Sequence, residues 1–155
     1  MTNHSSAVEV DGLLHDLLQA SGICVTYKLA SSLPGSKPSL AVEFIGADSA
    51  LLTAHGGELL LAMEHIAAKA IRLEAGQRDL LSFDTGGWKA ERDRRLVQSA
   101  DAAVDRVRAT GVAFAFPPMS SHERRLLHLA LAASGLPTAS EGEGPMRHLV
   151  LKPVA

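Results

Sequence analysis

The 155-residue chain is poor in aromatic residues and cysteine, and it has no long apolar run. Aromatic residues make up 4% of the chain, so few rings are available for base stacking. A single cysteine, Cys24, excludes an internal disulfide and favours a reduced, cytoplasmic setting. No apolar stretch approaches the length of a bilayer span, and the N-terminus lacks the pattern of a signal peptide. We therefore expect a cytoplasmic protein without membrane insertion.

The net charge of −2 argues against a strongly basic nucleic-acid binder, but the charge is unevenly distributed. Residues 1–75 contain four Lys/Arg and eight Asp/Glu, whereas residues 76–155 contain eleven and nine. Ten of the fifteen basic residues are arginine. This modest difference in charge indicates that the two halves have different functions.

Apolar periodicity and turn residues predict an α+β fold, and the first half gives helix, strand, strand and helix. We expect a helix over residues 6–22, a buried strand over 23–30 that contains Cys24, and an antiparallel strand over 40–46. A long amphipathic helix should follow Gly56-Gly57. Its expected apolar face consists of Leu59, Ala62, Met63, Ile66 and Ala70.

The second half begins after a third strand within residues 80–89, and we place the domain boundary there, giving domains 8–84 and 85–155. A helix is expected over 90–111, followed by short strands within 112–119 and at 149–151. Ser120 and Glu123 form an S-x-x-E capping box that predicts the start of another helix. The buried face expected for the helix over 90–111 consists of Leu96, Ala100, Ala103, Val104 and Val107.

Enzyme and metal motifs are missing from this sequence. There is no G-x-S-x-G elbow, P-loop or dinucleotide fingerprint, and Cys24 has no base near it in sequence. His122 and His128 are six residues apart, so they point to different faces of a helix and do not chelate one ion together. Glu123 is better explained as a helix cap than as a metal ligand. We expect no catalytic residues, no cofactor and no metal.

Arg124 and His128 remain as the notable pair, because a spacing of four places both side chains on one helix face. Arginine suits bidentate phosphate contacts, and histidine can donate to a phosphate oxygen. The alternative is a solvated helix face with Arg124 paired to a carboxylate such as Glu141. Residue chemistry alone favours that alternative, since most charged residues on helices face solvent.

The spacing Arg124-x-x-x-His128 resembles the signature of the R-three-H domain, a small module that binds single-stranded nucleic acid. The segments "ATGVAFAFPPMSSHERRLLHLAL" and "TASEGEGPMRHLVLKP" resemble the bacterial Jag family (SpoIIIJ-associated protein). The resemblance runs from about Leu13 to Pro153, and its specific part is Thr110–Pro153. It implies a type II KH-like α/β sandwich, packed against or linked to an R-three-H domain with helices on a short mixed sheet. The chain begins a few residues before its first expected helix, so we expect no separate N-terminal domain of the Jag type.

A KH domain carries a G-x-x-G loop, usually with basic middle residues, whose backbone clamps phosphates. The matching positions here are Ala54, His55, Gly56 and Gly57. The first glycine has become alanine, whose Cβ hinders close approach of the backbone, and the middle positions carry little charge. Together with the acidic first half, this argues against nucleic-acid clamping by the loop and favours packing or partner contact.

The resemblance implies that the chain binds single-stranded RNA or DNA mainly through its C-terminal half. Arg124 and His128 would be the central contacts, and further positive charge would come from Arg125, Arg147, Lys89 and Arg92. With few phosphate contacts, affinity should be modest and should fall with salt. The alternative hypothesis is a protein-interaction module that recruits a membrane-insertion, cell-envelope or ribosome-associated partner, or a homo-oligomer formed through the half containing His55.

Overall fold

The computed structural model describes residues 2–33 and 35–155, and the chain divides into two compact units, Met1–Trp88 and Lys89–Ala155. This division lies four residues beyond the boundary predicted at 84/85. No helix in the described part of the chain combines the length and the apolar character that a membrane span requires.

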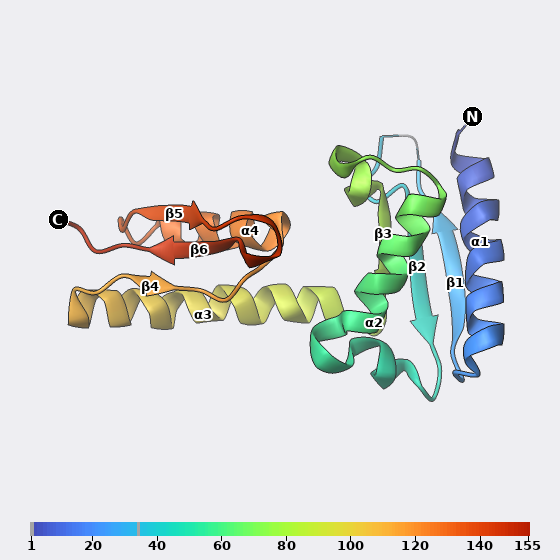
Figure 1. Ribbon diagram of the computed structural model, residues 1–155, viewed down its shortest axis with the longest axis horizontal. Coiled ribbons are helices and arrows are strands. Elements are labelled where there is room, and N and C mark those ends of the chain that lie inside the picture. The colour runs from blue at the N-terminus through green and yellow to red at the C-terminus, as the bar shows by residue number, and fades with distance from the viewer. Residues whose placement is uncertain (1, 34) are drawn as a thin grey trace. The chain divides into compact units, whose positions relative to one another are not determined.

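The first unit is a three-stranded sheet with two helices (Figure 1). The strands lie in the order β1-β2-β3, with β2 antiparallel to β1 and parallel to β3. The antiparallel pairing of the first two strands was predicted correctly. The elements are α1 (Thr2–Ser21), β1 (Thr26–Ser31), β2 (Leu40–Ile45), α2 (Ser49–Ala70), a 3₁₀ turn (Ala75–Leu80) and β3 (Leu81–Asp84).

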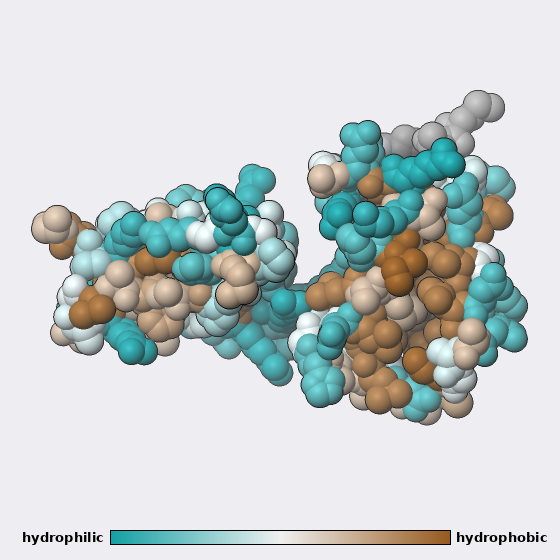
Figure 2. All heavy atoms as spheres, in the orientation of Figure 1, coloured by the Kyte–Doolittle hydropathy of each residue, from teal (hydrophilic) through white to brown (hydrophobic). Residues whose placement is uncertain are grey.

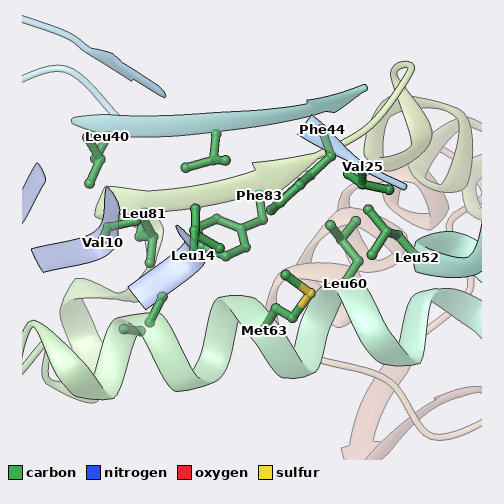
Figure 3. Packing of buried hydrophobic residues seen from close by; sticks show 13 residues of the cluster. Val10, Leu14, Val25, Leu40, Phe44, Leu52, Leu60, Met63, Leu81 and Phe83 are labelled. Carbon is green, nitrogen blue, oxygen red and sulfur yellow. The ribbon is translucent and has the colours of Figure 1, made fainter. Parts of the chain in front are cut away.

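One face of this sheet is apolar because its residues alternate, with every second side chain pointing to the helices. Leu40, Val42 and Phe44 of β2 are buried, and so is Phe83 of β3. The rings of Phe44 and Phe83 meet edge to face, with centroids 5.4 Å apart. Figure 3 shows both rings beneath the strands, with Leu14 of α1 beside Phe83. Both helices therefore cover the same face, and the unit is a two-layer sandwich.

Two sequence predictions for this unit are wrong. Cys24 is exposed and precedes β1, and its backbone N–H donates to an Asp48 carboxylate oxygen at 2.8 Å. The buried face of α2 is also different from the predicted one: of the predicted residues only Met63 is buried, while Leu59 and Ile66 are exposed. The observed buried face is rotated by about one residue, roughly 100° around the helix. It consists of Leu60, Met63, Ala67 and Ala68 together with Leu52 and Gly57 before them.

The second unit is a three-stranded sheet in the order β4-β6-β5, with α3 and α4 in the same hydrophobic cluster. All its strand pairs are antiparallel, so the mixed sheet predicted for this half is wrong. Strand β5, within a segment interpreted as a loop, was missed. The elements are α3 (Trp88–Thr110), β4 (Phe114–Ala115), α4 (Ser121–Ala132), β5 (Thr138–Glu141), a 3₁₀ turn (Gly144–Met146) and β6 (His148–Leu151).

The core of the second unit joins both helices to the sheet. The predicted face of α3 is confirmed, since four of its five residues are buried and Leu96 packs against the cluster. Leu127 and Leu131, one turn apart on α4, are fully buried and fix which side of that helix faces the core. Arg124 and His128 lie beside this buried stripe, about 60° further around the helix, where Arg124 is half-buried and His128 is exposed.

Candidate nucleic-acid interface

Helix α4 begins at Ser120 because a complete capping box holds its first turn. The backbone N–H of Glu123 donates to Ser120 Oγ at 3.2 Å, and the N–H of Ser120 donates to Glu123 Oε2 at 2.9 Å. These bonds satisfy two backbone donors that a helix start otherwise leaves without partners. The predicted capping role of Glu123 is confirmed.

Glu123 also joins α4 to α3 through its second carboxylate oxygen. Arg92 Nη2 lies 2.8 Å from Glu123 Oε1, and the Glu123 side chain is only 10% exposed. His122 Nε2 lies 3.2 Å from Asp93 Oδ2 on the same pair of helices. Arg92 was predicted as an electrostatic contact for nucleic acid, but its guanidinium group forms an ion pair with Glu123 within the fold. His122, rejected as a metal ligand, contacts a carboxylate instead.

Arg124 is half-buried, and its guanidinium group is held in place by neutral oxygens. Nη1 donates to the carbonyl of Met119 at 2.8 Å, and Nη2 donates to Ser121 Oγ at 3.1 Å. Among the described residues no carboxylate lies within ion-pair distance of this guanidinium. Glu141 instead pairs with Lys152 at 2.9 Å, and the hydrogen bond from Lys152 lowers the pKa of Glu141. The alternative in which Arg124 pairs with Glu141 is therefore wrong.

His128 is exposed one turn further along α4, and it is oriented by β5. Its Nδ1 lies 2.5 Å from the hydroxyl oxygen of Thr138. When the Thr138 hydroxyl donates to Nδ1, the ring proton sits on Nε2, which is then a donor for a ligand. Thr138 was not singled out from the sequence, because nothing local links it to a residue ten positions earlier.

The other predicted contacts are distributed unevenly around this pair. Arg125 and Arg147 are exposed. The carbonyl of Arg147 accepts the N–H of Met119 at 3.1 Å, and its Nη1 donates to the carbonyl of Gly142 at 3.4 Å. Arg147 and Arg124 thus both form a hydrogen bond with the backbone of Met119. Lys89, in the first turn of α3, is half-buried.

The second candidate loop, in the first unit, interrupts α2. Ala54 is extended (φ −59°, ψ 153°), and His55, Gly56 and Gly57 all have positive φ, so the helix is broken at these positions. Gly57 is buried, and a Cβ there would overlap ring atoms of Trp88. His55 and Gly56 are exposed. The loop is thus a turn between two helical segments, and its last residue, Gly57, packs against the indole ring of Trp88.

Comparison with known proteins finds a family model that covers the helix carrying Arg124 and His128. Residues 94–153 match the family model described as the R-three-H domain. The second half of this chain is thus similar to an R-three-H domain. Both residues of the Arg124-x-x-x-His128 spacing lie inside the match, as do α4 and the whole sheet.

Two curated relatives extend the similarity beyond the R-three-H domain. The RNA-binding protein KhpB of Bacillus subtilis (strain 168) is 29% identical over 137 residues, covering 86% of this chain and 66% of the relative. The RNA-binding protein KhpB of Clostridium symbiosum is 24% identical over 117 residues, covering 75% of this chain and 53% of the relative. The chain thus spans about two thirds of the first relative and about half of the second.

Proposed function

We propose that this chain is a cytoplasmic, non-catalytic protein that binds single-stranded nucleic acid, RNA in particular, through its R-three-H domain. Arg124 and His128 are the central contacts, with Arg125 and Arg147 adding positive charge. Lys89 is a peripheral contact, and Arg92 acts mainly through Glu123. Both relatives are named RNA-binding protein KhpB, which supports RNA as the ligand.

The observation that carries this proposal is the fixed orientation of two donors on one helix face. Arg124 is held by the carbonyl of Met119 and by Ser121, and His128 is held by Thr138. Side chains fixed in this way lose little rotamer entropy on binding, so their contacts contribute more to affinity. A guanidinium group without a carboxylate partner and an imidazole N–H one turn away suit successive phosphate oxygens of a strand.

Replacing both central residues should abolish most of the binding. We expect Arg124→Ala/His128→Ala to weaken binding of a short, fluorescein-labelled single-stranded RNA at least tenfold. The reason is that charge-assisted hydrogen bonds contribute about 1.5–3 kcal/mol each. Fluorescence anisotropy at fixed salt measures the dissociation constant, and a single-stranded DNA of the same sequence tests the choice of nucleic acid.

The matched control is Arg78→Ala/His15→Ala, which removes the same residue types from exposed positions of the first unit. It should bind RNA like the wild type. If the Arg124→Ala/His128→Ala variant keeps its circular dichroism spectrum and also binds like the wild type, the assigned interface is incorrect.

We propose further that the first unit is a KH-like domain that contributes little to RNA binding. Support comes from its element order, its β1-β2-β3 sheet with two helices on one face, and the break in α2 at residues 54–57. The break falls where a KH domain carries its phosphate loop. Ala54 puts a methyl group on that loop, and His55 takes the place of a basic residue.

A protein-interaction role for the first unit is the second candidate function. Leu51, Leu59 and Ile66 of α2 are 54%, 37% and 48% exposed. Figure 2 shows hydrophobic side chains gathered over this part of the first unit. An exposed apolar surface of this kind often marks a contact with another protein, including a second copy of the chain.

Leu59→Glu/Ile66→Glu should remove such a contact and leave RNA affinity unchanged. Light scattering measures self-association, and pull-down with nuclease treatment separates direct partners from those held through RNA. Two results together would contradict direct contact through α2. In the first, nuclease treatment releases the partner from the wild-type protein. In the second, the Leu59→Glu/Ile66→Glu variant still retains the partner when no nuclease is added.

A further inference from the structure

An open groove of about 430 Å³ lies in the second unit, between α3 and the segment 114–119. Its volume is within the range of small-molecule clefts, so it suits a single planar group rather than a folded element. Its floor is apolar and its rim is charged, with the guanidinium groups of Arg92 and Arg95 on the α3 side. The main apolar lining residues are Leu96, Phe114, Phe116 and Met119.

The aromatic wall of the groove is well packed. The rings of Phe114 and Phe116 meet at 79° with centroids 4.9 Å apart, and Phe116 is 4% exposed. The guanidinium carbon of Arg106 lies 5.5 Å from the centre of the Phe114 ring. These contacts hold Phe114 in place, so the groove keeps its shape without a ligand.

The groove adjoins the proposed phosphate contacts at Met119 and Glu123. Met119 lines the groove, and its carbonyl accepts the hydrogen bond from Arg124 Nη1 at 2.8 Å. Glu123, which precedes Arg124 on α4, also lines it. A strand bound at Arg124 therefore passes beside the mouth of this groove.

The charges favour a nucleotide over a purely apolar ligand. Arg92 pairs with Glu123 at 2.8 Å, whereas the more exposed Arg95 pairs with Glu91 through Nε at 3.1 Å. A guanidinium group has five N–H donors, so the bond from Nε leaves the outer edge of Arg95 able to reach a further anion. An apolar lining beside the exposed guanidinium group of Arg95 matches a flat base next to a phosphate, whereas an apolar side chain of a peptide would leave Arg95 unused.

We propose that this groove receives one nucleobase of the single strand whose backbone contacts Arg124 and His128. The proposal rests on the proposed function and extends it, since it adds a base-binding position to the phosphate contacts. Base contacts against apolar and aromatic side chains tolerate different sequences, so the groove adds affinity more than sequence preference.

Filling the groove tests the proposal. Ser99 lines it and is exposed on α3, so Ser99→Trp places an indole in the groove without disturbing the core. We expect roughly tenfold weaker binding of a short single-stranded RNA by fluorescence anisotropy. The matched control is Gln98→Trp, which adds the same ring at an exposed neighbouring position outside the groove and should bind like the wild type. With an oligonucleotide of abasic sites, Ser99→Trp and the wild type should bind equally.

The outcomes separate this inference from the proposed function. If Arg124→Ala/His128→Ala weakens RNA binding but Ser99→Trp does not, the groove assignment is wrong and the phosphate contacts stand. If the double variant binds like the wild type, the function itself is wrong. Photocrosslinking of wild-type protein to RNA containing 4-thiouridine gives a test independent of any variant. Crosslinked peptides should include residues 92–99 or 114–119, and crosslinks confined to other segments would overturn the proposal.

Discussion

Gly57→Ala is expected to lower the free energy of unfolding of the first unit by about 3 kcal/mol. Gly57 has φ +77°, where an alanine costs roughly 1–2 kcal/mol. Its new Cβ would also overlap the Trp88 ring, with Cζ3 at 2.9 Å, and overpacking of this kind costs about 1–3 kcal/mol. Urea unfolding followed by tryptophan fluorescence measures the change, since Trp88 is the only tryptophan of the chain.

The variant Gly56→Ala separates the cost of the backbone conformation from the cost of the overlap with Trp88. Gly56 has φ +71°, nearly the same backbone conformation, but no atom outside the immediate chain lies within 4 Å of the Cβ position. This variant should lose only the backbone part, about 1 kcal/mol. Equal losses for the two variants would mean that the indole moves aside freely and that Trp88 does not fix the loop.

Glu123→Ala should be the most damaging substitution of a charged residue on α4, with a loss of about 2–3 kcal/mol, because the Glu123 side chain is almost fully buried. It removes the acceptor for the Ser120 N–H and leaves Arg92 without its carboxylate. Loss of a cap costs about 1 kcal/mol, and a further 1–2 kcal/mol follows from the broken pair, reduced because Arg92 is 37% exposed. Urea unfolding followed by far-ultraviolet circular dichroism gives the free energy.

Glu123→Gln is the matched variant, because glutamine still accepts the Ser120 N–H but lacks the charge that pairs with Arg92. It should lose about half as much stability. Amide hydrogen exchange should show faster exchange in the first turn of α4 for Glu123→Ala only. RNA affinity should fall in parallel, because Ser121 in this turn and Met119 just before the helix cap hold Arg124. Unchanged exchange in Glu123→Ala would show that the capping box does not hold this turn.

The features predicted correctly from the sequence depend on residues close together in the chain. Ser120 and Glu123 lie three positions apart, so the start of α4 could be predicted from the local sequence alone. The buried face of α3 was also clear, because polar and charged residues surround a narrow apolar stripe. In α2 nine of the twelve positions from Leu59 to Ala70 are apolar and they are spread around the helix, so periodicity could not decide which face packs on the sheet.

The features that were missed depend on partners far apart in the chain. Arg92 was grouped with the nucleic-acid contacts because its carboxylate, Glu123, comes 31 positions later. His128 was identified, but Thr138, which orients its ring, lies on a strand that was not predicted. The resemblance of the Arg124-x-x-x-His128 spacing to the R-three-H signature is the reason for the proposed nucleic-acid role of both residues, which helix geometry alone left open.

Strand β5 was missed because its sequence, Thr-Ala-Ser-Glu, is short and polar, and the same composition has a consequence for solubility. β5 is an edge strand whose last residue, Glu141, pairs across to Lys152 beyond the end of β6. An edge strand presents unpaired backbone groups that can template pairing with another chain. A carboxylate kept ionised by Lys152 at this edge places charge in the path of an incoming strand. The β5 edge of the sheet that orients His128 is therefore expected to resist pairing with a strand of another chain.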